Sequence, residues 1–437
     1  MTQRLAHFRR VAAAAAIACG LAPAGPGARA AAEAADVTVP GEIIVKLQST
    51  AALPAVLAAQ PVTLVAAFGP RPIYRLAVTG GAKVNTVVRA LLRMPQVQLA
   101  EPHAVHQSPE ARKNQAWAIG SEVEYRTQWA PDALRLPEAH GLATGSGVTV
   151  AVLDTGVDAS HPALAGRLRP GWDFVDRDAD PAEGGGPADA AWGHGTHVAG
   201  LVALAAPGAS IMPLRVLDAQ GGGTLWALAE ALIHAVDPDG NPATADGAQV
   251  INMSLGSLQR TRLMSTLAQI IACNPPAPRN PLLDLSDPGY DDDKRRCAAG
   301  PGALVVAAAG NGSSASEKQY PAAEGAYGLL PLAASNAARE IAPFSNRGGW
   351  IEAAAPGDGI TSAMPGGLWA TWSGTSMAAP LASGIAALVR ERQPMLTAKD
   401  LARRLERSSS NLCGSAIRQV DAVAALGDFT PADKPCP

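Results

Sequence analysis

The sequence has no concentration of basic residues. Its 437 residues include 35 Lys and Arg against 38 Asp and Glu, so the formal net charge is −3, and the sequence pI is about 6.3. Proteins that bind nucleic acid carry basic stripes or patches, so the composition indicates no nucleic-acid partner. The balance of charges favours neither acidic nor basic substrates.

Long apolar runs are scarce beyond the N-terminus. A bilayer-spanning helix needs about 20 apolar residues, and the Ala-rich stretches of this chain are interrupted by Pro, Gly or charge. We therefore expect no transmembrane segment. The first 30 residues resemble a secretory signal peptide, because three arginines precede the apolar run 11–19 and Ala28-Arg29-Ala30 offers a cleavage site. The protein is expected to be secreted or periplasmic.

Cysteine is also rare, with five residues. Cys19 ends the apolar run and leaves open a lipid-anchored alternative. Removal of the signal peptide leaves Cys273, Cys297, Cys413 and Cys436, an even number that favours two disulfides in an exported protein. Proximity favours pairing the first with the second and the third with the fourth. Free thiols are the alternative.

Four short motifs supply the groups of a serine hydrolase. They read Val-Leu-Asp-Thr-Gly at 152–156, Gly-His-Gly-Thr-His at 193–197, Ala-Ala-Gly-Asn-Gly at 308–312 and Gly-Thr-Ser-Met-Ala at 374–378. Acyl transfer needs a hydroxyl nucleophile, a general base, a carboxylate that orients the base, and donors for the oxyanion. The candidates are, in that order, Ser376, His194, Asp154 and Asn311.

The motifs follow the order Asp, His, Ser, which separates subtilisin from chymotrypsin and the α/β-hydrolases. They match the subtilisin-like (subtilase) serine endopeptidases nearly letter for letter, and the resemblance is strongest over 148–388. It implies that Ser376 attacks the peptide carbonyl, that His194 acts as base and then as acid, and that Asp154 orients it. Asn311 and the backbone N–H of Ser376 would bind the oxyanion.

A second histidine follows three residues after the first. Paired histidines often bind zinc, but no Glu lies between His194 and His197 and no third ligand is evident. The family motif gives the base role to His194 and leaves His197 a structural role. No cofactor is expected for the chemistry.

The region after about Trp129 alternates strand-like and helical segments. Strands are expected at 148–153, 210–216, 250–254, 304–309 and 329–334, with helices at 197–205, 225–236 and 262–271. This pattern predicts an α/β fold, a mostly parallel sheet with helices on both faces, with the site at the carboxyl ends of the strands. We assign residues 108–437 to this subtilisin-like catalytic domain.

The preceding residues predict a small α+β domain. The expected order is strand 42–47, helix 51–59, strands 62–67 and 73–78, helix 84–93 and strand 97–101. Residues 31–107 resemble a linker and the inhibitory propeptide of subtilases, in which a segment like 100–105 lies in the active-site cleft. The propeptide would serve as folding template and intramolecular inhibitor, with mature residues beginning between 107 and 126. An unrelated ligand-binding domain is the alternative.

The substrate is expected to be a protein or peptide that binds as an added strand. The family's cleft strands correspond to Gly221, Gly222 and Gly223 on one side and to Ser254, Leu255 and Gly256 on the other. Gln319 stands where relatives often have a small residue, in the pocket for the residue before the scissile bond. A polar or shallower pocket is predicted.

A structural calcium ion is a further expectation. Asp173, Asp176, Asp178 and Asp180 resemble the acidic calcium loop of some family members, and closely spaced carboxylates are hard-cation ligands. The alternative is a solvated acidic loop.

The sequence as a whole predicts an exported serine endopeptidase made as a zymogen. Two alternatives remain beside it. One is a prodomain-bound binding protein that keeps the fold without catalysis, and the other is a processing protease of narrow specificity.

Overall fold

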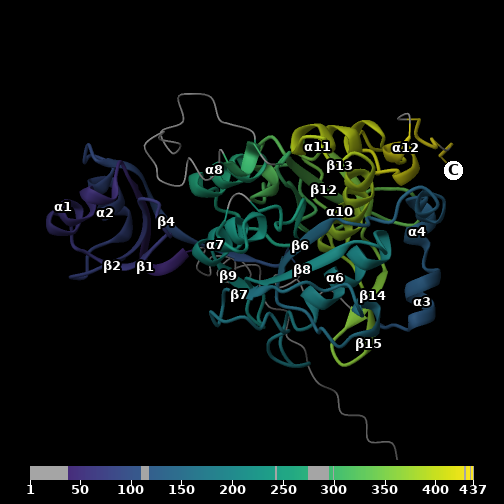
Figure 1. The fold of residues 1–437 in the computed structure, drawn as a ribbon, viewed down its shortest axis with the longest axis horizontal. Helices are drawn as coiled ribbons and strands as arrows, with labels where there is room; N and C mark the ends of the chain where they lie inside the picture. Colours follow the sequence, from purple (N-terminus) through teal and green to yellow (C-terminus); the bar gives the residue numbers. More distant parts are fainter. Residues whose placement is uncertain are drawn as a thin grey trace, which may run out of the picture. The chain divides into compact units, whose positions relative to one another are not determined.

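The computed structural model describes residues 38–109, 118–241, 244–273, 295–298, 300–427, 430–433 and 435–436. The predicted signal peptide and Cys19 lie outside these residues. We call residues 38–107 the N-terminal region and residues 118–436 the large region (Figure 1).

The large region is built on a seven-stranded sheet in which every pair of neighbours is parallel. The strand order is β13-β12-β11-β10-β6-β8-β7. In chain order, the strands are β6 (Thr149–Asp154), β7 (Trp172–Asp173), β8 (Ser210–Arg215), β10 (Val250–Met253), β11 (Leu304–Ala308), β12 (Leu329–Ser335) and β13 (Ala353–Pro356). The five predicted strands are all present, within two residues at each end.

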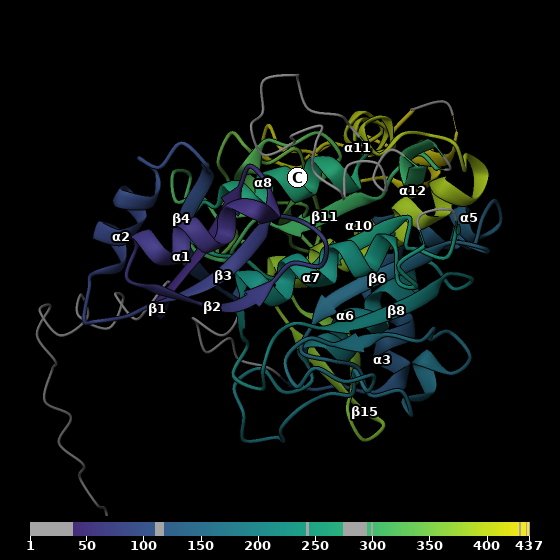
Figure 2. The same ribbon diagram turned by 60° about the vertical axis from the view of Figure 1, so that its left-hand side comes forward.

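The two faces of this sheet are buried by different helices (Figure 2). On β6, Val150 and Val152 join an apolar cluster with residues of α6 (His194–Ala205) and α10 (Thr375–Arg392). Ala151 and Leu153 point to the opposite face and join a cluster with α7 (Leu225–Val236) and α8 (Arg262–Ile271). Because successive side chains of a strand alternate between faces, helices on both sides account for a strand that is buried throughout. The predicted α/β class is confirmed.

Further elements that the sequence patterns did not predict surround this core. β5 (Ala118–Ile119), β14 (Ile360–Met364) and β15 (Leu368–Trp372) form an antiparallel sheet of order β14-β15-β5. Other helices among the described residues are α3 (Glu122–Thr127), α4 (Trp129–Ala133), α5 (Leu136–His140), α11 (Ala398–Arg407), α12 (Ala422–Leu426) and the 3-10 turns η3 (Pro162–Leu164) and η4 (Ala322–Glu324), and residues 295–298 are also helical.

The N-terminal region is an antiparallel sheet of order β2-β3-β1-β4, and β9 of the large region (Gly222–Thr224) extends it beyond β4. Its elements are β1 (Thr38–Leu47), η1 (Thr50–Ala52), α1 (Leu53–Ala59), β2 (Val62–Ala67), β3 (Ile73–Val78), α2 (Val84–Leu91) and β4 (Val97–Gln107). The predicted order of strands and helices is confirmed. The last strand, however, continues to Gln107 and does not stop at residue 101.

Both faces of the N-terminal sheet are also covered, although only one by the region's own helices. Ile43, Val45 and Leu47 of β1 share a cluster with residues of α1 and α2. Ile44, on the other face, belongs to the cluster that contains Trp226 of α7. The N-terminal region therefore completes its core on the large region.

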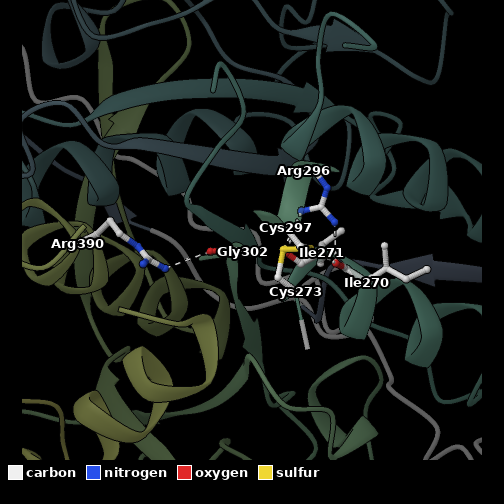
Figure 3. Close-up of a disulfide and its surroundings, with 7 residues drawn as sticks. All are labelled: Ile270, Ile271, Cys273, Arg296, Cys297, Gly302 and Arg390. Atoms are coloured by element: carbon white, nitrogen blue, oxygen red, sulfur yellow. Dashed lines mark hydrogen bonds between the residues drawn. A yellow bond between two sulfur atoms is a disulfide. The ribbon is translucent and has the colours of Figure 1, made fainter. Parts of the chain in front are cut away.

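Two disulfides lie in the large region. Cys273 pairs with Cys297 and Cys413 with Cys436, the two pairs that sequence proximity favours. Figure 3 shows the first of them at the end of α8, beside Arg296, whose guanidinium donates to the carbonyl oxygen of Ile270 over 2.6 Å. The disulfide and this bond tie residues 295–298 to α8.

Candidate active site

Asp154 and His194 form a buried hydrogen-bonded pair. Asp154 is the last residue of β6 and His194 the first of α6. The Nδ1 of His194 donates to Oδ1 of Asp154 over 2.6 Å, and each side chain is only 1% exposed. The same carboxylate oxygen accepts the backbone N–H of Thr155. This arrangement leaves Nε2 as the ring nitrogen that can take a proton from another group.

Glycines permit this close approach of strand and helix. A Cβ placed on Gly195 would lie 2.1 Å from the carbonyl oxygen of Gly156 and 3.1 Å from Cβ of Asp154. Gly193, the N-cap residue just before the helix, has φ +84°, a left-handed conformation that favours glycine. The glycines of the second motif are therefore explained by backbone geometry.

Ser376 lies in the first turn of α10 and is fully buried. Its Oγ donates to the carbonyl oxygen of Ser254 over 3.2 Å, and the hydroxyl of Ser254 donates back to the carbonyl oxygen of Ser376 over 2.8 Å. That carbonyl would ordinarily accept the N–H of the residue four positions later, which is Pro380 and has none. The carbonyl oxygen of Ser376 is therefore available to accept the hydroxyl of Ser254.

Thr375, the residue before Ser376, holds the side chain of Asn311 in place. Its Oδ1 accepts both the backbone N–H and the hydroxyl of Thr375, each over 2.9 Å. Two donors identify this atom as the amide oxygen and orient the amide NH₂ away from Thr375. Asn311 therefore presents donors from a fixed side chain, as an oxyanion site requires.

These residues gather at one edge of the parallel sheet. Asp154 ends β6, Ser254 follows β10 and Asn311 follows β11, and these three strands are neighbours. The carboxyl ends of parallel strands meet at one edge, where such folds hold their sites. Ser376 comes to the same edge through its bonds with Ser254.

His197 occupies a different environment from His194. Its Nε2 lies 3.1 Å from the carbonyl oxygen of Ala370, and its ring stacks on Trp372 with 5.0 Å between ring centroids. Burial lowers the pKa of His197 to about 3, so the ring stays neutral. Among the described residues no group of three or more His, Cys, Asp or Glu is arranged to hold a metal ion.

Both predicted cleft segments pair with the end of β4. Residues 105–107 pair antiparallel with β9, and Ser108 donates its N–H to the carbonyl oxygen of Gly221 over 3.0 Å. On the other side, Gln107 and Gly256 exchange two backbone hydrogen bonds of 2.8 Å. The end of β4 thus lies between the two cleft segments as an added strand. The sequence analysis placed residues 100–105 in the cleft. In the structure the residues that pair with the cleft segments are 105–108, a few residues further toward the C-terminus.

Two further residues of β4 bond to the starts of helices. The carboxylate of Glu101 accepts the backbone N–H groups of Arg262 and Leu263 at the start of α8, over 3.0 and 3.3 Å. The Nε2 of His103 accepts the N–H of Trp226 at the start of α7, and its Nδ1 lies 2.7 Å from Glu42. Burial raises the pKa of Glu101 and lowers that of His103. The sequence patterns indicated neither contact.

Gln319 fills space beside the cleft. A Cβ on Gly256 would lie 2.5 Å from Cγ of Gln319, and one on Gly310 would lie 1.9 Å from its Oε1. The side chain is therefore inserted between a cleft segment and the loop that carries Asn311, with only 6% of the residue exposed.

The four aspartates predicted to bind calcium do not form a cation site in this structure. The guanidinium of Arg215 bonds to the carboxylates of both Asp173 and Asp176. Asp178 instead pairs with Asp173 through the backbone, and its side chain accepts the N–H of Asp180. A positive side chain already neutralises the two nearest carboxylates, which does not fit a bound cation.

Glu183 is the main feature of this site that the sequence analysis missed. Its carboxylate accepts the hydroxyl of Thr155, which follows Asp154, and both the N–H and the hydroxyl of Thr196, which lies two residues after His194. Burial raises the pKa of Glu183 to about 7, with a smaller contribution from the charge of Asp154. The residue lies in a Gly- and Pro-rich loop without a motif.

Comparisons with known proteins identify the family of this chain. Residues 145–425 match the model of the subtilase family, and residues 25–103 match that of the fervidolysin N-terminal prodomain. The chain is similar in fold to crystalline fervidolysin from Fervidobacterium pennivorans, with a TM-score of 0.67 and 23% identity over 92% of this chain and 62% of that one.

Curated relatives include thermitase of Thermoactinomyces vulgaris, 33% identical over 69% of this chain and 91% of thermitase. A thermophilic serine proteinase of Bacillus sp. strain AK1 is 34% identical over 70% of this chain. An extracellular protease of Xanthomonas campestris is 31% identical over 82% of this chain. The matches span 66% and 64% of the Bacillus and Xanthomonas proteins. The chain belongs to the subtilase family of serine peptidases.

Proposed function

We propose that this chain is an exported serine endopeptidase, made as a zymogen, that hydrolyses peptide bonds of protein substrates through an acyl-enzyme on Ser376. The observation that carries the proposal is the pairing of one extended segment with both cleft segments, one of which bonds to Ser376 through Ser254. An extended peptide held by its main chain suits a protease that accepts proteins.

In the proposed mechanism, Ser376 attacks the carbonyl carbon of the scissile peptide bond while His194 takes the hydroxyl proton on Nε2. Asp154 keeps the proton of His194 on Nδ1 and stabilises the imidazolium that forms. The amide NH₂ of Asn311 and the N–H of Ser376 donate to the oxyanion. His194 then protonates the leaving amine, and a water molecule, activated by the same histidine, hydrolyses the acyl-enzyme.

The proposal includes the domain boundaries. Residues 1–30 would be removed as a signal peptide, residues 31–107 would hold the linker and the inhibitory propeptide, and residues 108–437 would form the catalytic domain. Occupation of the cleft by β4 supports inhibition before cleavage, because a protein substrate would have to displace the same main-chain bonds. No helix in the described part of the chain is long and apolar enough to cross a membrane.

A narrower specificity is the second candidate, and Gln319 is the observation that favours it. Its side chain lies against the positions of Gly256 and Gly310. A polar group there leaves less room beside the cleft than a small residue would, so small or hydrogen-bonding side chains are favoured before the scissile bond. Cleavage of a peptide library by wild type and by Gln319→Gly tests this. Broader acceptance of large apolar residues by the variant is expected, and an unchanged profile would remove the assignment.

The proposed activity is tested by labelling the purified chain with a fluorophosphonate serine probe, beside Ser376→Ala, while the N-terminal mass is followed over time. Labelling of wild type alone, with loss of the first 107 to 126 residues, is the expected result. A wild-type chain that neither labels nor shortens, even after an added protease removes the N-terminal region, would favour the non-catalytic binding protein.

A further inference from the structure

The start of α6 lacks the usual capping groups on its own chain segment. Its N-cap residue is Gly193, which has no side chain, and its first turn contains no acidic residue. The first N–H groups of a helix have no partner within the helix and need one elsewhere. Since His194 is the first residue of α6, whatever satisfies these groups also fixes the position of its imidazole.

The missing partners come from outside the helix. The hydroxyl of Thr155 accepts the N–H of Gly195 over 2.9 Å. The carboxylate of Glu183 accepts the N–H of Thr196 over 3.1 Å and its hydroxyl over 2.7 Å. Glu183 also accepts the hydroxyl of Thr155, so a single carboxylate bonds to residues adjacent to both members of the Asp154–His194 pair.

We propose that Glu183 is a positioning residue that holds the start of α6 against the end of β6 and thereby fixes the hydrogen bond between Asp154 and His194. This inference rests on the proposed function, because it assigns Glu183 a part in the same reaction. Glu183 does not touch the serine or the substrate in the mechanism above. It acts through the two threonines, and a carboxylate at a helix N-terminus is favoured there by the helix dipole.

Glu183 is also a further group near the Asp154–His194 pair whose charge can change with pH. It borders a cavity of about 530 Å³, through which solvent protons can reach it. The ionisable residues around it are Asp154 on β6, His194 on α6, Arg215 of β8 beside Gly184, and Asp158, Arg169 and Asp180, which line the same cavity. Because the pKa of Glu183 is raised to about 7, its charge changes in the range where the enzyme would work.

The first experiment measures the rate of fluorophosphonate labelling of Ser376 in Glu183→Ala and Glu183→Gln. Small displacements of a catalytic group reduce rates strongly, so Glu183→Ala should label about 10- to 100-fold more slowly than wild type. Glu183→Gln keeps the size and one acceptor and should lose less. The matched control is Glu230→Ala, which removes a carboxylate from a surface ion pair with Arg177 and should label at the wild-type rate.

The second experiment is independent of activity. In the full-length Ser376→Ala chain, the proton on Nδ1 of His194 is followed by NMR at low field as a function of pH. With Glu183 present, its chemical shift should show two inflections, one from His194 and one from Glu183. Glu183→Gln should leave one inflection, and Glu183→Ala should also exchange this proton with solvent faster.

The two experiments separate failure of this inference from failure of the proposed function. If wild type does not label even after an added protease removes the N-terminal region, the proposed function fails, and the NMR titration still tests Glu183. The same exchange rate and the same pH profile of this proton in Glu183→Gln, in Glu183→Ala and in the chain with Glu183 would overturn the inference. Wild-type labelling rates together with an unchanged low-field proton in Glu183→Ala would overturn it as well.

Discussion

The two sheets of this molecule are stabilised in different ways. The parallel sheet of the large region has helices of its own region on both faces, so β6 is buried at all six positions. The antiparallel N-terminal sheet has its own helices on one face only and uses α7 for part of the other. The N-terminal region therefore depends on the large region for its core, whereas the large sheet has a complete core of its own.

The contact between the regions also differs in chemistry from both cores. Beside apolar contacts such as the edge-to-face pair of Phe68 and Trp226, it contains the buried imidazoles of His103 and His106 and the partly buried carboxylate of Glu101. Buried polar groups stabilise only while their partners remain in place. An interface of this kind is specific and can be released, which suits an inhibitor that is later removed.

The largest expected effect comes from a substitution in the large region that should reduce catalysis and leave the N-terminal region unchanged. Asp154→Asn replaces the acceptor for the Nδ1 proton of His194 and favours the wrong tautomer, so kcat should fall by about 10⁴-fold. The proposed mechanism gives Asp154 no part in holding β4, so hydrogen exchange of the β4 amides should stay unchanged. Activity within about 10-fold of wild type would contradict the assigned role of Asp154.

A backbone change in β4 should separate the regions without altering the catalytic residues. Gln107→Pro removes the N–H that donates to Gly256, and should cost about 2–3 kcal/mol in the free energy of opening of β4. Hydrogen exchange in the full-length Ser376→Ala chain measures this. Gln107→Ala is the matched control because it keeps both main-chain bonds. Equal protection in the two variants would show that this pairing does not hold β4.

How far the sequence predicted these features depends on where each residue finds its partners. The strands β6, β10 and β11 are continuous apolar runs, and their positions were predicted within two residues. In contrast, β4 was predicted to end at residue 101. Its last six residues include His103, which accepts the N–H of Trp226, and His106, which pairs with Gly223 of the large region. Local periodicity carries no information on such distant partners.

The site shows the same division. Asp154 and His194 lie in motifs, and the predicted pair is hydrogen-bonded in the structure. Glu183 lies in a loop whose local sequence has no pattern. Only the structure shows that its carboxylate accepts the hydroxyls of Thr155 and Thr196. The acidic loop shows a related limit of the sequence, since nothing in the sequence places Arg215 beside Asp173.

A smaller effect is expected from the helix contact of Glu101. Glu101→Ala removes the acceptor for two N–H groups at the start of α8, and losses of such caps cost about 1–2 kcal/mol. The opening free energy of β4, measured in the Ser376→Ala chain, should fall by this amount. Glu138→Ala, in an exposed pair with Arg135, is the control and should leave it unchanged. Equal values for both variants would exclude a stabilising role for Glu101.

The smallest effect concerns pH. Burial lowers the pKa of His103 in the folded chain, whereas a free imidazole titrates near 6.5. A detached β4 therefore binds protons more readily, so this contribution to stability is complete above about pH 6.5 and is lost as the pH falls toward the native pKa. Protonation would also replace the acceptor that Nε2 offers to Trp226 with a second donor.

His103→Gln sharpens this prediction, because an amide can accept from Trp226 and donate to Glu42 without titrating. Between pH 6.5 and 5.5, the opening free energy of β4 in the Ser376→Ala chain should fall more than in the same chain with His103→Gln, and by at most about 1 kcal/mol more. Hydrogen exchange, corrected for the intrinsic pH dependence of amide exchange, supplies the measurement. His106, whose pKa burial lowers to about 3, is present in both chains. Parallel pH profiles would show that His103 binds protons equally well whether or not β4 is attached, and would exclude His103 as a source of acid sensitivity in the contact between the regions.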